Sequence, residues 1–394
     1  MKYYINFLRD KPIIRSLSLV NFIASFGAWF STVAIYTMVV EFGSSEFAIA
    51  IVTAMHFIPA ILIAPFSGSL IDRLRIKPLM VTLLFIELSM TACFLLVETA
   101  SDLWLLLIFI FIRMSAASMF FSSEMSLLAK IATGKDLQTA NEIQSIIWSF
   151  TYAVGMAVSG FIVNLYGVKA AILIDVAIFV LAFIVFLNIK INIEYKKVEE
   201  KILELMIDGL RYIKNNKIIL HLIFLHASVG LTSYDALITI LAKNEYKELI
   251  AVPLAIGLSN AVRAVALMIG PLFLNKIIKK DNLQYLLIFQ GITIIIWAFA
   301  QSNFYLSLGA LFFVGFSTAF LWSYTYALLQ NHCDKKYIGR VISYNDMFFM
   351  LANVLTTLFI GTMAHITTTS IITICLGVAF LLYAYYYTKI YSKI

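Results

Sequence analysis

Six ionisable side chains interrupt long apolar stretches of this sequence. They are Glu87, Arg113, His226, Asp235, Arg263 and Asp346. If these stretches lie in a membrane, each such group costs about 2.5–3.5 kcal/mol, so each is a candidate functional residue. A guanidinium can bind an anionic or hydrogen-bonding ligand. Carboxyl and imidazole groups can bind and release a proton near neutral pH when burial disfavours their charged forms.

Arg113 allows two interpretations. It lies about eleven residues into an apolar run, and Glu124 is eleven residues further on, about 16 Å away along a helix. The two therefore cannot pair directly. Glu87, on the preceding run, reaches a similar depth, so a Glu87–Arg113 ion pair could simply hold the helices together. In the other interpretation Arg113 faces a central cavity and binds the ligand.

Arg263 lies in the middle of a later run, and His226 and Asp346 approach its depth. His226 and Asp235 are nine residues apart, so they point in opposite directions on an ideal helix. Only one can face a cavity unless the segment 229–233, VGLTS, bends the helix. Asp235 is the preferred proton-binding carboxylate, with a cap at the membrane surface as the alternative. The predicted proton-coupling residues are Asp235, Asp346 and Glu87.

Aromatic residues indicate the character of the ligand. Trp29 and the pair Trp322 and Tyr326, one helical turn apart, could stack against an apolar or aromatic molecule, although ordinary packing explains most aromatic residues in an apolar protein. The predicted ligand contacts are Arg113, Trp29, Trp322, Tyr326, Arg263 and His226.

Other chemistry is not indicated. His56, close to Pro59, is interpreted as a structural histidine at a kinked turn. The five histidines lack metal-ligand spacing, and no metal or cofactor is expected. The fragment 132–136, ATGKD, does not complete a phosphate-binding loop, so an ion gradient, most plausibly of protons, is the expected energy source. An enzyme is not expected.

The elements that position these residues follow from composition. Of 394 residues, 62% are hydrophobic and only 13% charged, which requires lipid as the solvent for much of the chain. The net charge of +7 is not a nucleic-acid signal, because the basic residues fall between apolar runs. The three cysteines form neither a disulfide framework nor a zinc site. The first apolar run is too long for a signal peptide.

Apolar runs long enough to cross a bilayer number twelve, and lipid forces each to be helical. The first six are 14–42, 46–70, 78–99, 103–131, 139–165 and 168–190. The second six are 218–243, 251–275, 283–301, 304–330, 340–365 and 368–388. The expected fold is an all-α membrane protein of two six-helix bundles.

The distribution of basic residues predicts the orientation. Of the 29 Lys and Arg residues, 24 fall on the side of the N-terminus, three on the opposite side and two within helices. The excess marks the cytoplasmic side, so both termini are expected in the cytoplasm, with a bacterial-type inner membrane as the location.

One long polar segment divides the chain. It predicts an N-terminal bundle at 1–190, a cytoplasmic linker at 191–217 and a C-terminal bundle at 218–394. Apolar residues recur at helical spacing in the linker, which predicts an amphipathic helix on the inner membrane surface. They are Ile202, Leu205, Met206, Leu210 and Ile213.

The segment 66–79, FSGSLIDRLRIKPL, carries unusual charge between two apolar runs. Its Gly68, Asp72, Arg73, Arg75 and Lys77 resemble the loop signature G-x-x-x-D-R-x-[GR]-x-[RK] of the major facilitator superfamily. The segments KDLQTAN, DGLRYIKNN and GRVIS are similar to the branch that holds macrolide-efflux and enterobactin-exporter proteins. The resemblance implies that the first, fourth, seventh and tenth helices line a central cavity. It also implies that the second, fifth, eighth and eleventh meet across the two halves.

The resemblance departs from the family in one place. Exporters of this superfamily often carry a Gly-Pro pair in the fifth helix, where this sequence has Gly155–Met156. Gly155 and Gly160 still permit close helix approach.

By the same resemblance, the loop forms a latch. Gly68 lets the second helix approach the eleventh, and Asp72 meets the eleventh helix near Gly339 or Arg340. Arg73 is expected to pair with Glu124. The alternative is a loop that only sets topology. The predicted gating residues are Gly68, Asp72, Arg73, Glu124 and Arg340.

These observations predict a proton-coupled exporter of a small amphiphilic or hydrophobic compound, such as a drug, macrolide or siderophore. It would act by alternating access about a site near the membrane midplane. An uptake or lipid-translocating transporter of an anionic solute or lysolipid is the alternative, and a non-transporting membrane sensor has weaker support. The expected partners are the small-molecule substrate, protons and the lipid bilayer, without nucleic acid, and the expected state is a monomer.

Overall fold

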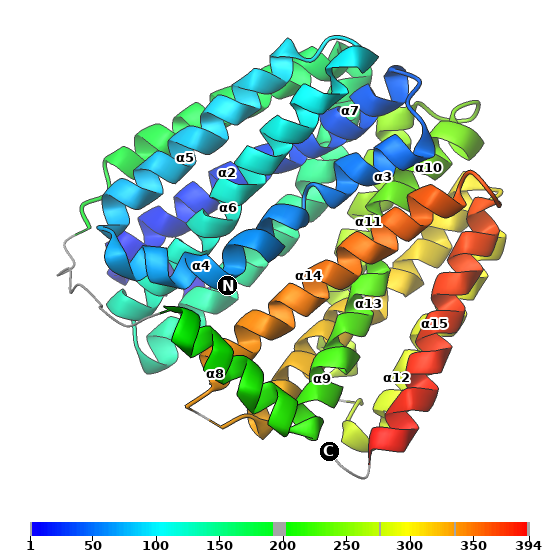
Figure 1. Ribbon diagram of the computed structural model, residues 1–394. Coiled ribbons are helices and arrows are strands. Elements are labelled where there is room, and N and C mark those ends of the chain that lie inside the picture. Colours follow the sequence, from blue (N-terminus) through cyan, green and yellow to red (C-terminus); the bar gives the residue numbers. More distant parts are fainter. Residues whose placement is uncertain (1, 192–201, 276, 335, 392–394) are drawn as a thin grey trace.

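The computed structural model describes residues 2–191, 202–275, 277–334 and 336–391, and these are arranged as helices without a strand (Figure 1). The helices of the first half are α1 (Lys2–Asp10), α2 (Pro12–Glu41), α3 (Glu46–Ala54), α4 (Ile58–Arg73), α5 (Ile76–Cys93), α6 (Leu103–Ile131) and α7 (Gly134–Leu187). Those that follow are α8 (Ile202–Asn215), α9 (Lys217–Ala227), α10 (Asp235–Leu241), α11 (Val252–Leu274), α12 (Leu283–Ala300), α13 (Phe304–His332), α14 (Ile338–Met363) and α15 (Thr369–Ile390).

Eleven helical segments of the described chain are long and apolar enough to cross a membrane. The longest, α7, has 54 residues and is interrupted at Gly167, whose φ of +81° is open to glycine but strained for other residues. Gly167 therefore divides α7 into two membrane spans. The prediction of twelve spans, with a boundary between 165 and 168, is confirmed for the described residues.

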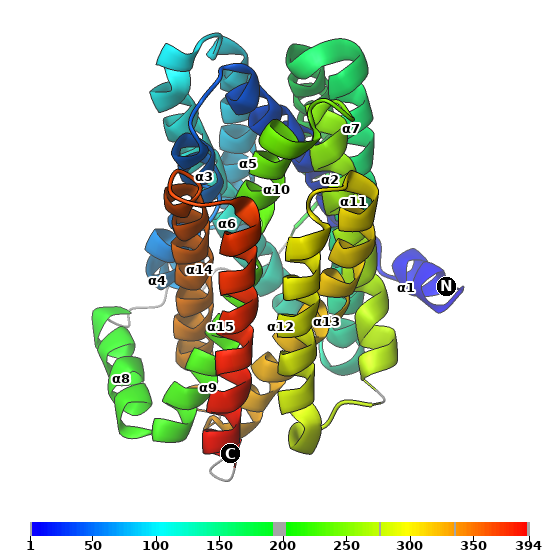
Figure 2. The same cartoon turned by 90° about the vertical axis from the view of Figure 1, so that its right-hand side faces the viewer.

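The spans form two bundles of six helices, one from each half of the chain (Figure 1; Figure 2 shows them turned by 90°). The bundles meet where α11 packs on the first part of α7 and where α14 packs on α3 and α4. These are the second, fifth, eighth and eleventh spans, as the resemblance implied.

Glycines allow two of these approaches between bundles. A Cβ atom on Gly160 would lie 2.7 Å from the carbonyl oxygen of Pro253, and one on Gly257 would lie 2.6 Å from that of Met156. Gly361 of α14 faces Ala50 of α3 in the same way. Small residues at such crossings let helix backbones pack closely within a membrane.

The seventh span is broken. Between α9 and α10 the chain forms a 3-10 turn at Ser228–Thr232, and Ser233 has non-helical dihedral angles of φ −76° and ψ 78°. The helix is therefore bent at 229–233, the segment at which the sequence left a bend open. It changes the direction in which Asp235 projects relative to His226.

Helix α8 confirms the helix predicted in the linker, and it is attached to the second bundle. Arg340 on α14 donates to Asp208 on α8 over 2.6 Å, and the ring of Tyr212 stacks on that of Tyr337 with centroids 4.2 Å apart. The hydroxyl of Tyr344 donates to the carbonyl of Met206 over 3.0 Å. The described partner of Arg340 is thus Asp208. The predicted roles of Gly68 and Asp72 stay predictions, because the surroundings of Gly68 and the side chain of Asp72 lie outside the described part.

Candidate functional site

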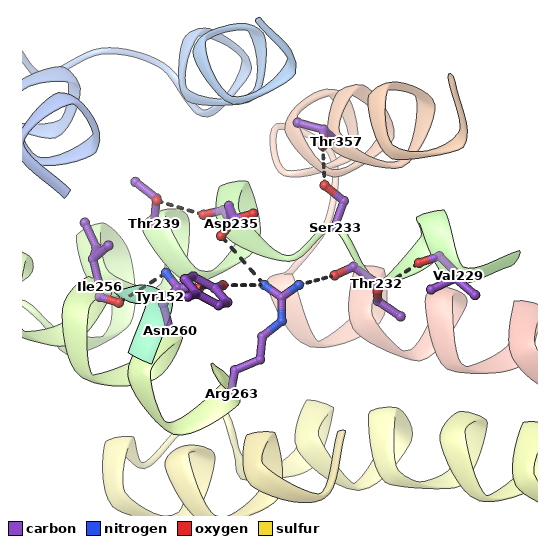
Figure 3. Close-up of polar contacts among 10 residues, drawn as sticks. All are labelled: Tyr152, Val229, Thr232, Ser233, Asp235, Thr239, Ile256, Asn260, Arg263 and Thr357. Atoms are coloured by element: carbon purple, nitrogen blue, oxygen red, sulfur yellow. Dashed lines mark hydrogen bonds and ion pairs between the residues drawn. The ribbon is translucent and has the colours of Figure 1, made fainter. Parts of the chain in front are cut away.

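A network of polar side chains connects the two bundles around Arg263 (Figure 3). Its guanidinium lies 3.6 Å from the Asp235 carboxylate, donates to the carbonyl oxygen of Thr232 over 3.0 Å and reaches the Tyr152 hydroxyl at 3.5 Å. Tyr152, on α7 of the first bundle, donates to the Oδ1 of Asn260 over 3.1 Å. The side chains of Arg263 and Asp235 are 11% and 19% exposed, so the pair is enclosed but not sealed.

The broken seventh span makes this network possible. A continuous helix would use the carbonyl of Thr232 in its own backbone ladder, whereas at the break this carbonyl accepts from the N–H of Tyr234 over 2.9 Å and from Arg263. Ser233 is held by a 3.0 Å hydrogen bond to Thr357 on α14. Asp235 then begins the next helix beside Arg263. The structure therefore brings together two residues that the sequence singled out separately.

Aromatic side chains of the first bundle flank the network. The centroid of the Trp29 ring lies 4.5 Å from that of Tyr152 and 6.3 Å from that of Trp148. Gly155 makes room for Trp29, because a Cβ there would lie 2.9 Å from the Trp29 Cβ. Trp148 is 49% exposed and was not predicted as a site residue. Trp29, which was predicted to contact the ligand, thus lies beside two further aromatic rings, those of Tyr152 and Trp148.

A second aromatic cluster surrounds His226 on the facing helices of the second bundle. Its imidazole lies against the rings of Trp322, Tyr326 and Phe349, with centroids 5.5–5.8 Å apart. Its Nδ1 bonds the Thr325 hydroxyl over 2.8 Å, and its buried Nε2 has no partner among the described residues. Asp346, on the same helix as Phe349, accepts from Asn345 over 3.4 Å. His226, Trp322 and Tyr326, predicted as ligand contacts, are therefore neighbours.

Arg113 forms an ion pair within the first bundle, and its partner is Asp175, not Glu87, which one of the two interpretations considered. Its guanidinium pairs with Asp175 over 3.2 Å, while Glu87 is buried nearby on α5 without a described bond to Arg113. Asp175 was missed, although a single carboxylate in the run ILIDVAIF meets the criterion that selected the other six. Arg113 itself is buried between the rings of Phe94 and Phe179 within the first bundle. Its predicted contact with a ligand has no support from this placement.

Glu124 belongs to a separate polar network at the other end of the first bundle. It accepts a 2.7 Å hydrogen bond from Gln144, which in turn accepts from Asn21. Ser25 donates to Asn21 over 2.7 Å. Glu124 is buried and Arg73 is exposed, and the pair between them stays a prediction.

Ionic contacts join the two bundles at one end of the molecule, called here the Glu46 end. Glu46 of α3 pairs with Lys243 over 2.9 Å and lies 3.6 Å from the Nδ1 of His365. Lys243 also donates to the carbonyl of Ser44 over 2.7 Å. Lys243 is 197 positions from Glu46 and 199 from Ser44, and no local pattern of the sequence indicated these contacts.

We expect Glu46→Gln to weaken the closure of the Glu46 end. Loss of this partly exposed ion pair should cost about 1 kcal/mol, which changes the ratio of closed to open states about fivefold. The labelling rate of a cysteine introduced at the buried position Thr53 on α3, in a protein whose native cysteines are replaced, reports the opening. Glu245→Gln, on an exposed residue of the same segment as Lys243, is the control and should leave the rate unchanged. Equal rates for both variants would contradict a closing role of Glu46.

The described residues contain no group of three or more His, Cys, Asp or Glu side chains that could hold a metal ion. The chemistry of the site is therefore that of one guanidinium, one carboxylate, hydroxyl groups and aromatic rings. Such a set can bind an organic molecule and a proton.

Comparison with known proteins gives concordant matches. Residues 17–357 match the family model described as Major Facilitator Superfamily. An uncharacterised MFS-type transporter of Bacillus subtilis (strain 168), YfiS, is 23% identical over 184 residues, which cover 45% of this chain and 43% of that protein. The chain thus aligns with less than half the length of this relative.

Solved structures share the fold over nearly the whole chain. The nucleoside transporter NupG superposes with a TM-score of 0.76 at 12% identity, covering 96% of this chain and 99% of its own. A bacterial homologue of the human lysosomal transporter Spinster, in an inward-facing and unoccupied conformation, gives 0.71 at 13% identity, with 96% and 95% covered. A D-xylose-proton symporter gives 0.72 at 14% identity, with 94% and 97% covered. At these identities the similarity shows the fold alone.

Proposed function

The chain belongs to the Major Facilitator Superfamily, whose members are transporters and not enzymes, and from this we propose that it is a proton-coupled exporter of a small amphiphilic or hydrophobic compound. Drugs, macrolides and siderophores are the substrate types considered, as for the macrolide-efflux and enterobactin-exporter branch that the sequence resembles. The proposed location is the inner membrane of a bacterial-type cell, with both termini in the cytoplasm and a monomer as the working unit.

The Arg263–Asp235 pair carries this proposal. It lies where the two bundles meet, it is bonded to Tyr152 of the opposite bundle, and aromatic rings flank it. A ligand held there contacts both bundles, and both must shift when access alternates from one side to the other. Trp29, Trp148 and Tyr152 supply the apolar surface that an amphiphilic ligand requires.

Coupling follows from the chemistry of Asp235. A ligand that donates a hydrogen bond binds the ionised carboxylate of Asp235 more strongly than the protonated acid, which keeps only a weaker, neutral acceptor. Ligand binding and proton binding at Asp235 then oppose each other, which is the requirement for exchange in opposite directions. One proton moving inward at 100 mV supplies about 2.3 kcal/mol, enough for a gradient of more than tenfold.

The arrangement of the bundles supports a state open to the cytoplasm. The ionic and glycine contacts between bundles lie at the Glu46 end, which the basic residues of the sequence place outside. At greater distance from that end, Trp148 and Trp322 are 49% and 40% exposed. Substrate would enter from the cytoplasmic side, opposite to the Glu46 end.

Uptake of an anionic solute is the second candidate, and the geometry of Arg263 favours it specifically. Its contacts to Asp235 and Tyr152, at 3.6 and 3.5 Å, are long for charge-assisted hydrogen bonds. An anion bound to Arg263 would replace Asp235 as the partner and favour a proton on the released carboxylate. Anion and proton would then travel together. A lysolipid headgroup would use the same chemistry, while a sensor that transports nothing has no supporting observation here.

We expect Asp235→Asn to abolish the response of transport to a pH gradient and to weaken ligand binding, and the binding that remains should no longer depend on pH. Neutral asparagine keeps the size and hydrogen-bonding ability of the side chain but cannot exchange a proton. The assay uses proteoliposomes with an imposed pH gradient and radiolabelled erythromycin, or another compound that raises the melting temperature of the purified protein. Asp346→Asn is the matched control in the same bundle.

The direction of proton movement separates the candidates. Proton movement opposite to the substrate supports export, and movement with the substrate supports uptake of an anion. Full dependence on the pH gradient in Asp235→Asn, with loss in Asp346→Asn, would move the coupling role to Asp346. A ligand that binds without any accompanying flux would favour the sensor.

A further inference from the structure

Three ionisable side chains meet inside the first bundle, away from the Arg263 network. Glu87 on α5, Arg113 on α6 and Asp175 on the second part of α7 are 7%, 5% and 0% exposed. They come from three different helices, and the function proposed above does not use them. Buried charges must be balanced, and this group has two acidic side chains for one basic side chain.

Glu87, Arg113 and Asp175 are called here the Asp175 cluster. Arg113 and Asp175 form its centre. Nη2 of Arg113 lies 3.2 Å from Oδ2 of Asp175, and the rings of Phe94 and Phe179 lie 5.5 and 5.2 Å from the guanidinium carbon. Both side chains of the ion pair are buried, that of Asp175 completely, so the pair has little contact with water. The pair is therefore held in a dry part of the bundle, where unbalanced charge is expensive.

Asp175 has one carboxyl oxygen without a partner among the described residues. Ser31 donates to Oδ2, the oxygen that also meets Arg113, whereas the buried Oδ1 accepts no described hydrogen bond. Oδ1 occupies space that a side chain at residue 27 would fill, since a Cβ at Gly27 would overlap that oxygen. A carboxyl oxygen that is buried and unpartnered is suited to carry or share a proton.

Glu87 adds a second carboxyl group to a cluster that has one guanidinium. It lies close enough to Arg113 and Asp175 for both charges to act on it, and its carboxylate has no hydrogen bond within the described part of the chain. Two buried carboxyl groups thus lie within electrostatic range of one guanidinium. If both were ionised, the cluster would hold a buried net negative charge.

The remaining titratable group near the cluster does not restore the balance. His56, between α3 and α4, lies within electrostatic range of Arg113. Its Nδ1 bonds the backbone carbonyl of Val52 over 3.1 Å and its ring packs on Tyr36. A positive imidazole beside Arg113 would add repulsion in an apolar setting, so His56 fits the neutral, structural role predicted for it.

We propose that Glu87 and Asp175 together bind one proton, forming a proton-binding site inside the first bundle. In the resting arrangement Asp175 is the ionised partner of Arg113 and Glu87 is the neutral acid. Either carboxyl group can be the ionised one. When substitution removes one of them, the other becomes the counter-ion of Arg113. The inference does not depend on the proposed function, because the proton is bound whether or not a substrate is transported.

Infrared spectroscopy of the purified protein in lipid nanodiscs at neutral pH tests this site. A protonated carboxyl group has a C=O stretching band that carboxylates and amides lack. We expect the difference spectrum of wild type minus Glu87→Gln to contain one such band. Wild type minus Asp175→Asn should contain a band of the same size, because Glu87 loses its proton to neutralise Arg113 when Asp175 can no longer do so. Glu124→Gln is the control for a buried acid elsewhere in the same bundle, and any band that it removes should persist in both cluster variants.

The same variants give a second readout in melting temperature. Each single variant keeps one carboxylate for Arg113 and should lower the melting temperature only slightly. The double variant Glu87→Gln/Asp175→Asn leaves Arg113 without a counter-ion, and its decrease should exceed the sum of the two single decreases. Additive decreases, a spectrum unchanged by Glu87→Gln, or a band retained in Asp175→Asn would each overturn the proposal.

Discussion

The Gly270→Ala substitution should lower the free energy of unfolding by about 2–3 kcal/mol. Gly270 lies on α11 where it crosses α13, and a Cβ at this position would fall on the carbonyl oxygen of Phe316 and 3.2 Å from its Cα. The obstacle is backbone, so it cannot move aside as the end of a flexible side chain can. Both helices belong to the second bundle, so no rocking of one bundle against the other relieves the overlap.

Thermal unfolding in detergent, followed by circular dichroism, measures this effect. Gly309→Ala is the matched control, because Gly309 lies on α13 and nothing would approach its Cβ within 4 Å. Alanine has the higher helix propensity, so the control should keep or slightly raise the melting temperature. Equal melting temperatures for the two variants would mean that the crossing of α11 and α13 accommodates a methyl group, which would contradict the packing described here.

Gly361→Ala should change the conformation and not the stability. Gly361 of α14 faces α3 across the boundary between the bundles, where a Cβ would overlap that of Ala50 and lie 3.1 Å from the carbonyl oxygen of Glu46. Separation of the bundles at the Glu46 end removes the overlap. A penalty of about 2–3 kcal/mol on the closed arrangement would change the ratio of closed to open states by roughly 30- to 150-fold.

Labelling of a cysteine at Thr53 distinguishes this outcome. Thr53 is on α3 and is fully buried in the structure, so an impermeant maleimide should react faster in Gly361→Ala than in the parent protein. The melting temperature should change less than in Gly270→Ala. A large loss of stability without faster labelling would mean that the bundles do not separate at this boundary, and alternating access by rocking would then need another hinge.

The elements of the fold could be predicted because lipid leaves few choices. A run of about 20 apolar residues must be a helix in the bilayer, and the basic residues between runs set the orientation of the helices across the membrane. The break in the seventh span was left open by the sequence, where VGLTS was named as the segment that could bend the helix between His226 and Asp235.

The pairing of charges could not be predicted in the same way. Depth along a helix follows from counting residues, but the rotation of each helix about its axis is set by packing against its neighbours. Glu87 and Asp175 reach similar depths beside Arg113, and only the packing shows that Asp175 is the partner at 3.2 Å. Asp175 itself could have been found, since it is an isolated carboxylate in an apolar run.

Contacts between the bundles were the least predictable. Glu46 and Lys243 lie in different halves of the chain and meet only because the bundles close at that end. A contact within the first bundle, that of Trp148 with Trp29, was also hard to predict, because Trp148 carries no polar signal that separates it from an aromatic residue facing lipid. Its place beside Trp29 depends on Gly155, whose missing side chain lets the helices approach.

The turn at Gly167 bears on how the protein is assembled in the cell. The fifth and sixth spans are joined by this glycine within a single run of residues, α7, without a separate loop. Leu165 and Tyr166 beside it are exposed and suited to the lipid interface, and Lys169 is neutralised by Glu98 over 2.7 Å. A nascent chain therefore has almost no polar material to carry across the bilayer at this point. We therefore expect the two spans to insert into the membrane together, as one hairpin.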